Sequence, residues 1–356
     1  MKLLLGLILV FAGTAQAEEI THGFTATQSK WMAGQNDLAT QNFAGTVRGE
    51  KDDVIRPYAE YKDQGYLIFN DQFMFNSQIV KQGFLRHLPD SITPVVFTQN
   101  ESPEYVQSLK ERFGSYMIKN KEKLKIMYLE DSGNSFWARD NIPVPMHYTD
   151  QGKDHFMVVD AKYYYDFEPD EQVANHFNAL MWSHDYYFEG GNFVANDLGD
   201  CLVVDNERVE KIPNAIFESQ YGCTQLVRLP YLRGIGHADE SVKFVGDKLV
   251  LTDLQEYKEI LEEKGFQVIM MPRAKQKYET YLNSVILEDT IYVPVFGHPD
   301  DKEALAVYRN LGYNPVPLNS KTLSNRGLGS LHCISMVYPK VKYSTLLNNL
   351  GGEAIN

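Results

Sequence analysis

Residues 239–251, DESVKFVGDKLVL, and the residues that follow them contain the clearest pattern of secondary structure in the chain. Apolar and polar side chains alternate on both sides of Gly246 and Asp247, which is typical of a β-hairpin with a tight turn. Residues 254–264 then have a helical pattern that Gly265 ends as a C-terminal cap. Because the apolar run 268–270 predicts one more strand, the unit is strand–strand–helix–strand.

This unit recurs along the chain. Each copy opens on a polar residue, and the openings lie at intervals of 52, 47, 44 and 50 residues. They are Asp140, Asn192, Asp239, Asn283 and Cys333. A period near 50 residues is typical of repeat architectures. We therefore predict an α/β fold of five such units arranged radially, with the opening residues directed at one central channel. Further helices are predicted at 102–117, 171–182 and 300–311.

Charge and cysteine content exclude several protein classes. The 356 residues carry 34 Lys+Arg against 47 Asp+Glu, a net charge of −13, which argues against a general nucleic-acid binder. The cysteines, Cys201, Cys223 and Cys333, are too few for a disulfide framework and too dispersed for a zinc ribbon. An odd number leaves at least one thiol unpaired. The sequence does not decide whether Cys201 and Cys223 pair, nor what the oligomeric state is.

The first 17 residues have the pattern of a secretory signal peptide. Lys2 precedes an apolar run at 3–11, and Ala15-Gln16-Ala17 forms a small-residue cleavage site. The run is about half the ~20 residues that span a bilayer, so we expect a secreted or periplasmic protein with no membrane contact after cleavage. Residues 18–58 carry no pattern that we can interpret. We expect one catalytic domain at 59–340 and a tail at 341–356.

The opening residues and their neighbours combine a nucleophile with a base and several carboxylates. Cys333 with His237 is typical of nucleophilic catalysis. The carboxylates of Asp140, Glu189 and Asp239 suit a cation instead of a peptide carbonyl. A guanidinium matches them, because it is planar, permanently charged and carries five N–H donors. It would also lower the pKa of the nearby thiol.

Each of these residues also has a simpler interpretation. Trp137 can stack on a guanidinium, or it can be a core aromatic. Gly190 and Gly191 can form only a tight turn. Cys333 can be a small buried hydrophobe.

Four motifs in order resemble the bacterial, Porphyromonas-type peptidyl-arginine deiminase and agmatine deiminase family of the guanidine-modifying pentein superfamily. They are FWARDNIP at 136–143, EGGN at 189–192, GHADE at 236–240 and GLGSLHC at 327–333. The resemblance covers about residues 60–340. It implies a five-bladed α/β propeller with a central active site. It also implies hydrolytic deimination of a guanidino group to a ureido group and ammonia, without metal or cofactor.

The resemblance implies a role for each matched residue. Cys333 attacks the guanidinium carbon and forms a covalent amidino-thioether. His237 protonates the leaving ammonia and then activates water, and Glu189 orients His237. Asp140 and Asp239 bind the guanidinium nitrogens.

Three more residues are implied as substrate contacts, namely Trp137, Asn192 and Asn283. The sequence also departs from the family pattern. The Gly-Gly-Gly approach to the cysteine reads Gly327-Leu328-Gly329 here, and the Arg-Glu pair before it is replaced around 321–323.

The substrate stays open between two guanidino compounds. The signal peptide favours arginine in peptides or proteins. Residues 160–165 have a lysine, Lys162, where the peptidyl-arginine branch has arginines that hold a C-terminal carboxylate, and this favours agmatine, as in putrescine biosynthesis. A non-catalytic binder of guanidino ligands and an amidinotransferase are the alternatives of a different class.

Overall fold

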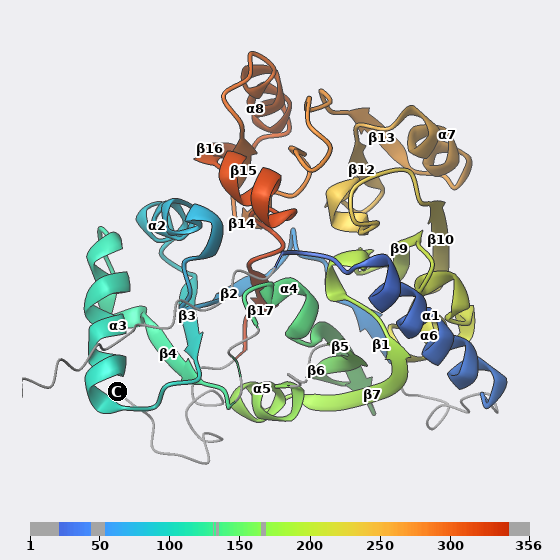
Figure 1. Ribbon diagram of the computed structural model, residues 1–356, viewed down its shortest axis with the longest axis horizontal. Coiled ribbons are helices and arrows are strands. Elements are labelled where there is room, and N and C mark those ends of the chain that lie inside the picture. The colour runs from blue at the N-terminus through green and yellow to red at the C-terminus, as the bar shows by residue number, and fades with distance from the viewer. Residues whose placement is uncertain (1–20, 44–53, 131, 133–134, 165–168, 342–356) are drawn as a thin grey trace, which may run out of the picture.

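The computed structural model describes residues 21–43, 54–130, 132, 135–164 and 169–341. The predicted signal peptide and the tail from residue 342 lie outside the described residues. Five small sheets stand around a common centre, as Figure 1 shows. The fold is the predicted five-bladed α/β propeller.

Three sheets repeat the predicted unit of a hairpin, a helix and a parallel third strand. Their strands are β8 (Val194–Ala195), β9 (Asp200–Asp205) and β10 (Gln225–Pro230); β11 (Val242–Gly246), β12 (Leu249–Thr252) and β13 (Gln267–Met270); and β14 (Val285–Leu287), β15 (Thr290–Val295) and β16 (Asn314–Asn319). Their helices are α6 (Asn214–Gln220), α7 (Gln255–Glu263) and α8 (Asp301–Asn310).

The other two sheets have four strands each. One consists of β5 (Val144–Asp150), β6 (Lys153–Lys162) and β7 (Leu180–Tyr187), with α5 (Asp170–Phe177) between the last two and β1 (Val54–Pro57) antiparallel to β5. The other consists of the parallel strands β2 (Gln64–Asn70), β3 (Thr93–Thr98) and β4 (Lys125–Tyr128), with α2 (Gln78–Arg86) and α3 (Pro103–Tyr116). The late strand β17 (Met336–Pro339) pairs antiparallel with β2 and closes the ring.

Turn and cap residues explain why the units form where the sequence predicts them. Gln151 and Gly152 take φ values of 45° and 74° between β5 and β6. Gly265 and Gly312 follow α7 and α8 with φ values of 89° and 93°, the left-handed conformation that glycine adopts without steric cost.

One predicted helix was too long. The helical pattern at 171–182 continues only to Phe177, because Asn178 takes a left-handed φ of 48° and ends α5. Leu180 instead begins β7 and pairs with Met157 in β6. Asparagine is one of the few residues that adopts this backbone conformation routinely.

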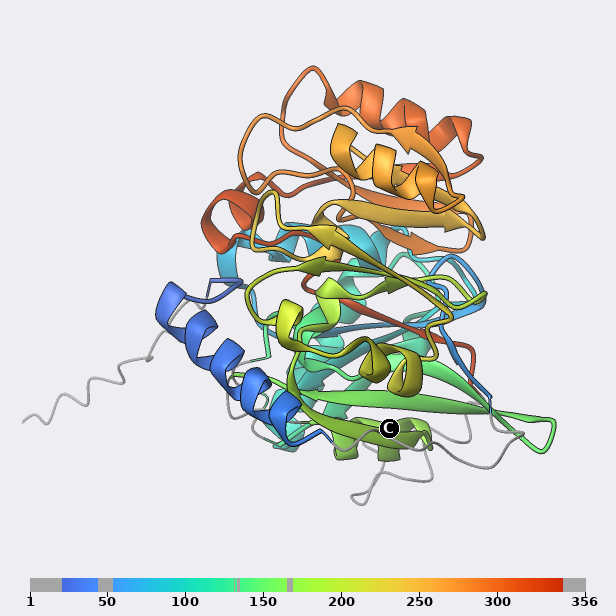
Figure 2. The ribbon, with the colours of Figure 1, turned by 90° about the vertical axis from the view of Figure 1, so that its right-hand side faces the viewer.

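The N-terminal segment forms a helix that the sequence analysis did not predict. Helix α1 (Ala26–Gln41) begins with a capping box, in which Thr25 Oγ1 accepts from Gln28 N and Gln28 Oε1 accepts from Thr25 N. The helix lies across one face of the ring (Figures 1 and 2). Asn36 fixes it to β7 through hydrogen bonds with Tyr187 N (2.7 Å) and Tyr187 O (3.0 Å).

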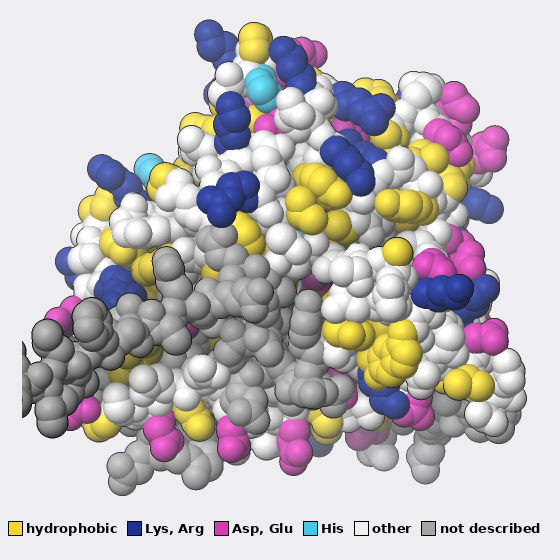
Figure 3. All heavy atoms as spheres, in the orientation of Figure 1, with side chains coloured by type: hydrophobic (Ala, Val, Ile, Leu, Met, Phe, Trp, Pro, Cys, Tyr) yellow, Lys and Arg dark blue, Asp and Glu magenta, His cyan; other side chains and the backbone are white. Residues whose placement is uncertain are grey.

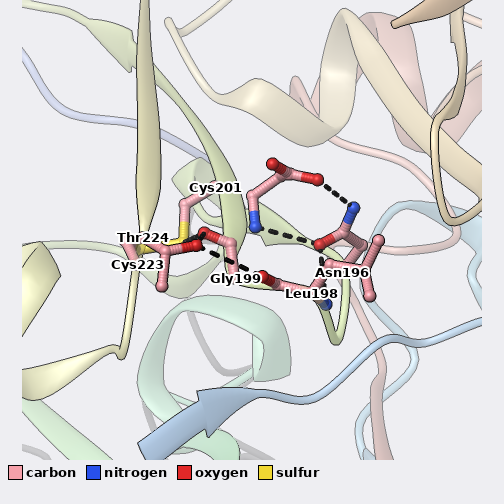
Figure 4. The surroundings of a disulfide bond; sticks show 7 residues. Asn196, Leu198, Gly199, Cys201, Cys223 and Thr224 are labelled. Atoms are coloured by element: carbon pink, nitrogen blue, oxygen red, sulfur yellow. Dashed lines mark hydrogen bonds between the residues drawn. A yellow bond between two sulfur atoms is a disulfide. The ribbon is translucent and has the colours of Figure 1, made fainter. Parts of the chain in front are cut away.

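Cys201 and Cys223 form a disulfide with a Cα–Cα distance of 5.7 Å (Figure 4). The bond joins β9 to the segment that follows α6, and Cys333 is the free thiol. Cross-linking residues that are 22 positions apart restricts the unfolded chain and stabilises the fold by about 3 kcal/mol in the chain-entropy picture.

The outer surface carries charges of both signs. Figure 3 shows positive and negative side chains interspersed around the rim of the face that α1 crosses. Among the described helices, none is long and apolar enough to cross a membrane.

Candidate active site

The segments that open the five units meet at the centre of the ring. Asp140 lies on the single turn α4 (Ala138–Asn141), and Asp239 lies on the short helical turn Ala238–Glu240. Arg139 N donates to Cys333 O at 3.1 Å, so the segment of Asp140 is joined directly to the loop of the nucleophile candidate. One hydrophobic cluster includes both Trp137 and Cys333, so the core itself fixes these two residues.

Asp140 is a buried carboxylate with several donors around it. Its Oδ1 accepts from Gly191 N at 3.1 Å and lies 3.6 Å from His237 Nδ1. Its Oδ2 lies 2.5 Å from Nε2 of His22. Burial works to raise the pKa of Asp140, but the charged imidazole of His22 and its hydrogen bond to the carboxylate outweigh burial and lower the pKa to about 2. Asp140 is therefore an ionised group that holds a cation.

His237 and Glu189 lie beside each other in the buried interior. His237 Nε2 is 3.9 Å from Glu189 Oε2, and Arg208 Nη2 is 2.8 Å from Glu189 Oε1. Burial lowers the pKa of His237, against the opposing carboxylates of Asp140 and Glu189. Within the described residues, neither ring nitrogen of His237 has a hydrogen-bond partner. The imidazole is thus neutral and available to a ligand.

One carboxylate oxygen of Asp239 is hydrogen-bonded, and the other has no hydrogen-bond partner among the described residues. Its Oδ2 forms a 2.7 Å hydrogen bond with Nδ1 of His332, whose Nε2 lies 2.6 Å from Glu60 Oε2. Its Oδ1 is buried and finds no hydrogen-bond partner in the described part of the chain. Buried polar atoms are nearly always satisfied, so this oxygen marks a place for a ligand donor.

Cys333 is positioned by one amide. Oδ1 of Asn283 lies 3.4 Å from the Cys333 Sγ, and the backbone N–H groups of His332 (2.9 Å) and Cys333 (3.3 Å) donate to the same oxygen. Burial and then the charge of Asp239 raise the pKa of the Cys333 thiol to about 11, against the opposing effect of His22. The thiol is therefore protonated at neutral pH while no further cation is present.

Asn192 and Trp137 occupy different surroundings. The Asn192 amide bonds backbone groups only, accepting from Val204 N (2.8 Å) and Ala238 N (3.0 Å) and donating to Val204 O (2.9 Å). Asn192 thereby fixes the position of the segment that contains His237. The Trp137 indole is buried and stacks on the imidazole of His22, with ring centroids 4.4 Å apart.

The sequence profile of the Porphyromonas-type peptidyl-arginine deiminases matches residues 90–339. The chain belongs to this family. Its fold is similar to agmatine deiminase of C. jejuni, with a TM-score of 0.67, 16% identity, and coverage of 83% of this chain and 99% of the other. A substrate-bound variant of that enzyme gives the same values. Agmatine deiminase of Enterococcus faecalis has a TM-score of 0.61 and 16% identity, with 83% and 100% covered. No curated protein matches the sequence.

The glycines of the family motifs are needed here for clearance. A Cβ at Gly190 would lie 2.4 Å from Arg139 O, and one at Gly191 would lie 2.7 Å from His237 Nδ1. Neither glycine has a positive φ, so a turn conformation is not the reason for them. A Cβ at Gly329 would lie 2.5 Å from the indole of Trp137. Leu328, which stands where the family has a glycine, takes a left-handed φ of 69°, a conformation that glycine adopts without the steric cost that leucine carries.

Three buried side chains have the composition of a metal site. His22, Asp140 and His237 place one ligand atom each within 4.8 Å of the others. The 2.5 Å contact between His22 and Asp140 is too short for two ligands of one tetrahedral zinc, which lie about 3.3 Å apart at ordinary bond lengths. The short contact fits a charge-assisted hydrogen bond.

Four residues of the site were not found from the sequence. Glu60, Arg208 and His332 act through ion pairs with partners outside their own secondary-structure elements, for which no local pattern exists. Only His332 had a signal, its position next to Cys333. The fourth, His22, lies 118 residues from Asp140, its closest partner.

Proposed function

We propose that this protein hydrolyses a guanidino group to a ureido group and ammonia through a covalent intermediate on Cys333. The observation that carries the proposal is the pair of carboxylates around the thiol. Asp140 is ionised, and Asp239 presents a buried oxygen that has no donor among the described residues. A planar cation with several N–H groups satisfies both at once, with its carbon facing the sulfur.

Binding of the substrate activates the nucleophile. The thiol pKa of about 11 reflects burial and nearby negative charge, and a guanidinium on Asp140 and Asp239 opposes both effects. The thiol proton moves to the neutral His237, and the thiolate adds to the guanidinium carbon. His237 returns that proton to the departing nitrogen as ammonia leaves.

The second half of the reaction consumes water. His237 takes a proton from water as the oxygen adds to the amidino carbon. The carbon–sulfur bond then breaks with its electron pair going to sulfur, the added hydroxyl group loses its proton to the released ammonia, and the ureido product leaves. His237 returns its proton to the thiolate. Glu189 stabilises the charged imidazole, and Arg208 holds Glu189 in place. Trp137 covers one face of the substrate, and Asn283 positions the sulfur.

Arginine in peptides or proteins is our first candidate substrate. The family description and the predicted signal peptide support it. The buried Cys201–Cys223 disulfide supports a secreted or periplasmic location, because such bonds persist in oxidising compartments.

Agmatine is the second candidate, and one observation favours it. Lys162, which replaces the arginines of the peptidyl-arginine branch, forms an ion pair with Asp185 at 2.8 Å. In this ion pair the charge of Lys162 is already bound to Asp185, whereas binding a peptide's C-terminal carboxylate would require that charge. Two proteins of similar fold are agmatine deiminases, at 16% identity to this chain.

A substrate panel tests the proposal. Purified protein is incubated with arginyl peptides and with agmatine, and both the ureido product and the released ammonia are measured. Ammonia without any added amine acceptor supports hydrolysis over amidino transfer. Cys333→Ser should abolish product while ligand binding remains measurable. Absence of product from both substrate types would refute the proposal, and binding without product would favour a non-catalytic binder.

A further inference from the structure

We propose that the N-terminal segment inhibits the active site of the chain to which it belongs. His22 occupies the subsite that would bind the guanidinium of the substrate. The segment must withdraw before substrate can bind. This inference rests on the proposed function, because that function defines what the subsite holds.

His22 makes the contacts that a guanidinium would make. Its ring is planar and 1% exposed, Nε2 lies 2.5 Å from Asp140 Oδ2, and one face stacks on Trp137. Burial lowers the pKa of His22, but the carboxylate of Asp140, together with a hydrogen bond to Cys333, outweighs burial and raises the pKa well above its ordinary value. The imidazole is therefore a cation on Asp140, next to the thiol.

Substrate and His22 cannot occupy the site together. Both oxygens of Asp140 are engaged, Oδ1 by Gly191 N and Oδ2 by His22. His22 also fills the space beside Gly329, where an added Cβ would lie 2.8 Å from the His22 ring. A guanidinium that is to pair with Asp140 and lie on Trp137 must displace the imidazole.

Specific contacts hold the segment in this position. His22 N donates to Gly327 O at 2.6 Å, in the glycine-containing approach to Cys333. Arg208, which also pairs with Glu189, lies over the ring of Phe24 at 5.2 Å and donates to Ser29 Oγ at 2.8 Å. Arg208 therefore holds both Glu189 and the N-terminal segment in place.

A glycine separates His22 from α1. Gly23 has a φ of 79°, which glycine adopts freely, and the capping box at Thr25 starts the helix two residues later. Rotation at Gly23 withdraws the imidazole while α1 stays on the face of the ring, where Figures 1 and 2 place it.

The size of the inhibition follows from the contact that is lost. A hydrogen bond to a charged group contributes roughly 1.5–3 kcal/mol, which corresponds to about 10- to 150-fold in affinity. Since substrate binds only to the withdrawn state, its apparent affinity is reduced by that factor. Removing the imidazole should restore it.

Alkylation of Cys333 by two matched reagents tests the inference without turnover. 2-Chloroacetamidine is a cation and 2-chloroacetamide is neutral and of similar size. With either reagent the sulfur displaces chloride to form a thioether. Cys333 is the free cysteine of the protein, so the intact mass counts the reaction. The rate ratio of the two reagents cancels changes in thiol pKa and in general access.

We expect His22→Ala to raise the amidinium-to-amide ratio at least tenfold, because Asp140 then attracts the cationic reagent. His22→Gln keeps a polar side chain without the charge and should also raise the ratio. His87→Ala, at an exposed histidine after α2, is the matched control and should leave the ratio unchanged. An unchanged or lower ratio in both His22 variants would overturn the inference.

Turnover separates this inference from the proposed function. His22→Ala should lower KM for the guanidino substrate at least tenfold with kcat within about threefold. A higher KM would make His22 part of the substrate site and would overturn inhibition. If no variant turns over any guanidino substrate, the proposed function fails, and the alkylation ratio still decides whether His22 fills a cation subsite.

Discussion

Replacing Gly191 by alanine should damage the site without disturbing the fold. Gly191 N donates to Asp140 Oδ1, and the glycine lies against three site residues at once. An added Cβ would be 2.7 Å from His237 Nδ1, 2.9 Å from Asp140 Oδ1 and 3.4 Å from Asp239 Oδ2. Only the last is an ordinary contact distance. The new methyl group therefore pushes on the imidazole and on the carboxylate that binds the substrate cation.

The expected magnitude follows from these distances. To reach an ordinary contact, His237 must move from 2.7 to 3.4 Å, a displacement of at least 0.7 Å. A misplacement of about 1 Å in an active site costs roughly a hundredfold in rate. That factor corresponds to about 2.7 kcal/mol of transition-state free energy. The free energy of unfolding should fall by about 1–3 kcal/mol, as is usual for overpacking.

The assay compares kcat/KM for ureido product with the free energy of unfolding in urea. Gly114→Ala is the matched control, since a Cβ at that position near the end of α3 meets no atom within 4 Å beyond its chain neighbours and the backbone of its own helix. It should leave turnover unchanged and stabilise the protein by about 0.5–1 kcal/mol. If Gly191→Ala turns over like the control while folded, the clearance argument is wrong.

Three further outcomes are expected. Replacing Cys201 and Cys223 together by alanine should reduce the free energy of unfolding by about 3 kcal/mol and leave the turnover of folded protein unchanged, and equal urea midpoints for variant and parent would contradict this. Asn283→Ala removes the acceptor of three donors around Cys333, so kcat should fall far more than KM changes, and unaltered kcat would speak against the positioning role. Burial, and then Asp239, raise the pKa of Glu240 from 4.5 to about 7, so the stabilisation that this group contributes is present below pH 4.5 and is lost as pH rises to 7. Between pH 4.5 and 7, the unfolding free energy of Glu240→Gln should therefore fall by about 3 kcal/mol less than that of the parent protein. An identical pH profile for the two proteins would disprove this expectation.

The repeating units could be predicted from the sequence because their signals are local. Alternating strands, the turn at Gln151-Gly152 and the cap at Gly265 each lie within a few residues of the element that they define. The helix prediction at 171–182 failed for the same kind of reason, since one residue, Asn178, ends α5 before the helical pattern fades.

The site was predictable only where motifs carry it. The structure brings together Asp140, Glu189, His237, Asp239 and Cys333, whose roles remain predictions. His22 escaped prediction because its partners lie more than 100 residues away and the segment around it has no amphipathic pattern. The capping box of Thr25 and Gln28, which the sequence analysis did not recognise, marks the start of α1.

The pairing of β17 with β2 has a consequence for how the protein acquires activity. Tyr338 lies opposite Tyr66, so the ring closes through a contact between residues 272 positions apart, and Cys333 sits three residues before β17. Contacts of such high sequence separation form late, because the entropy of closing a long loop opposes them. We therefore expect the nucleophile to reach its partners late in folding. In partly synthesised or partly folded chains, the active site is therefore not assembled, and we expect such chains to be inactive.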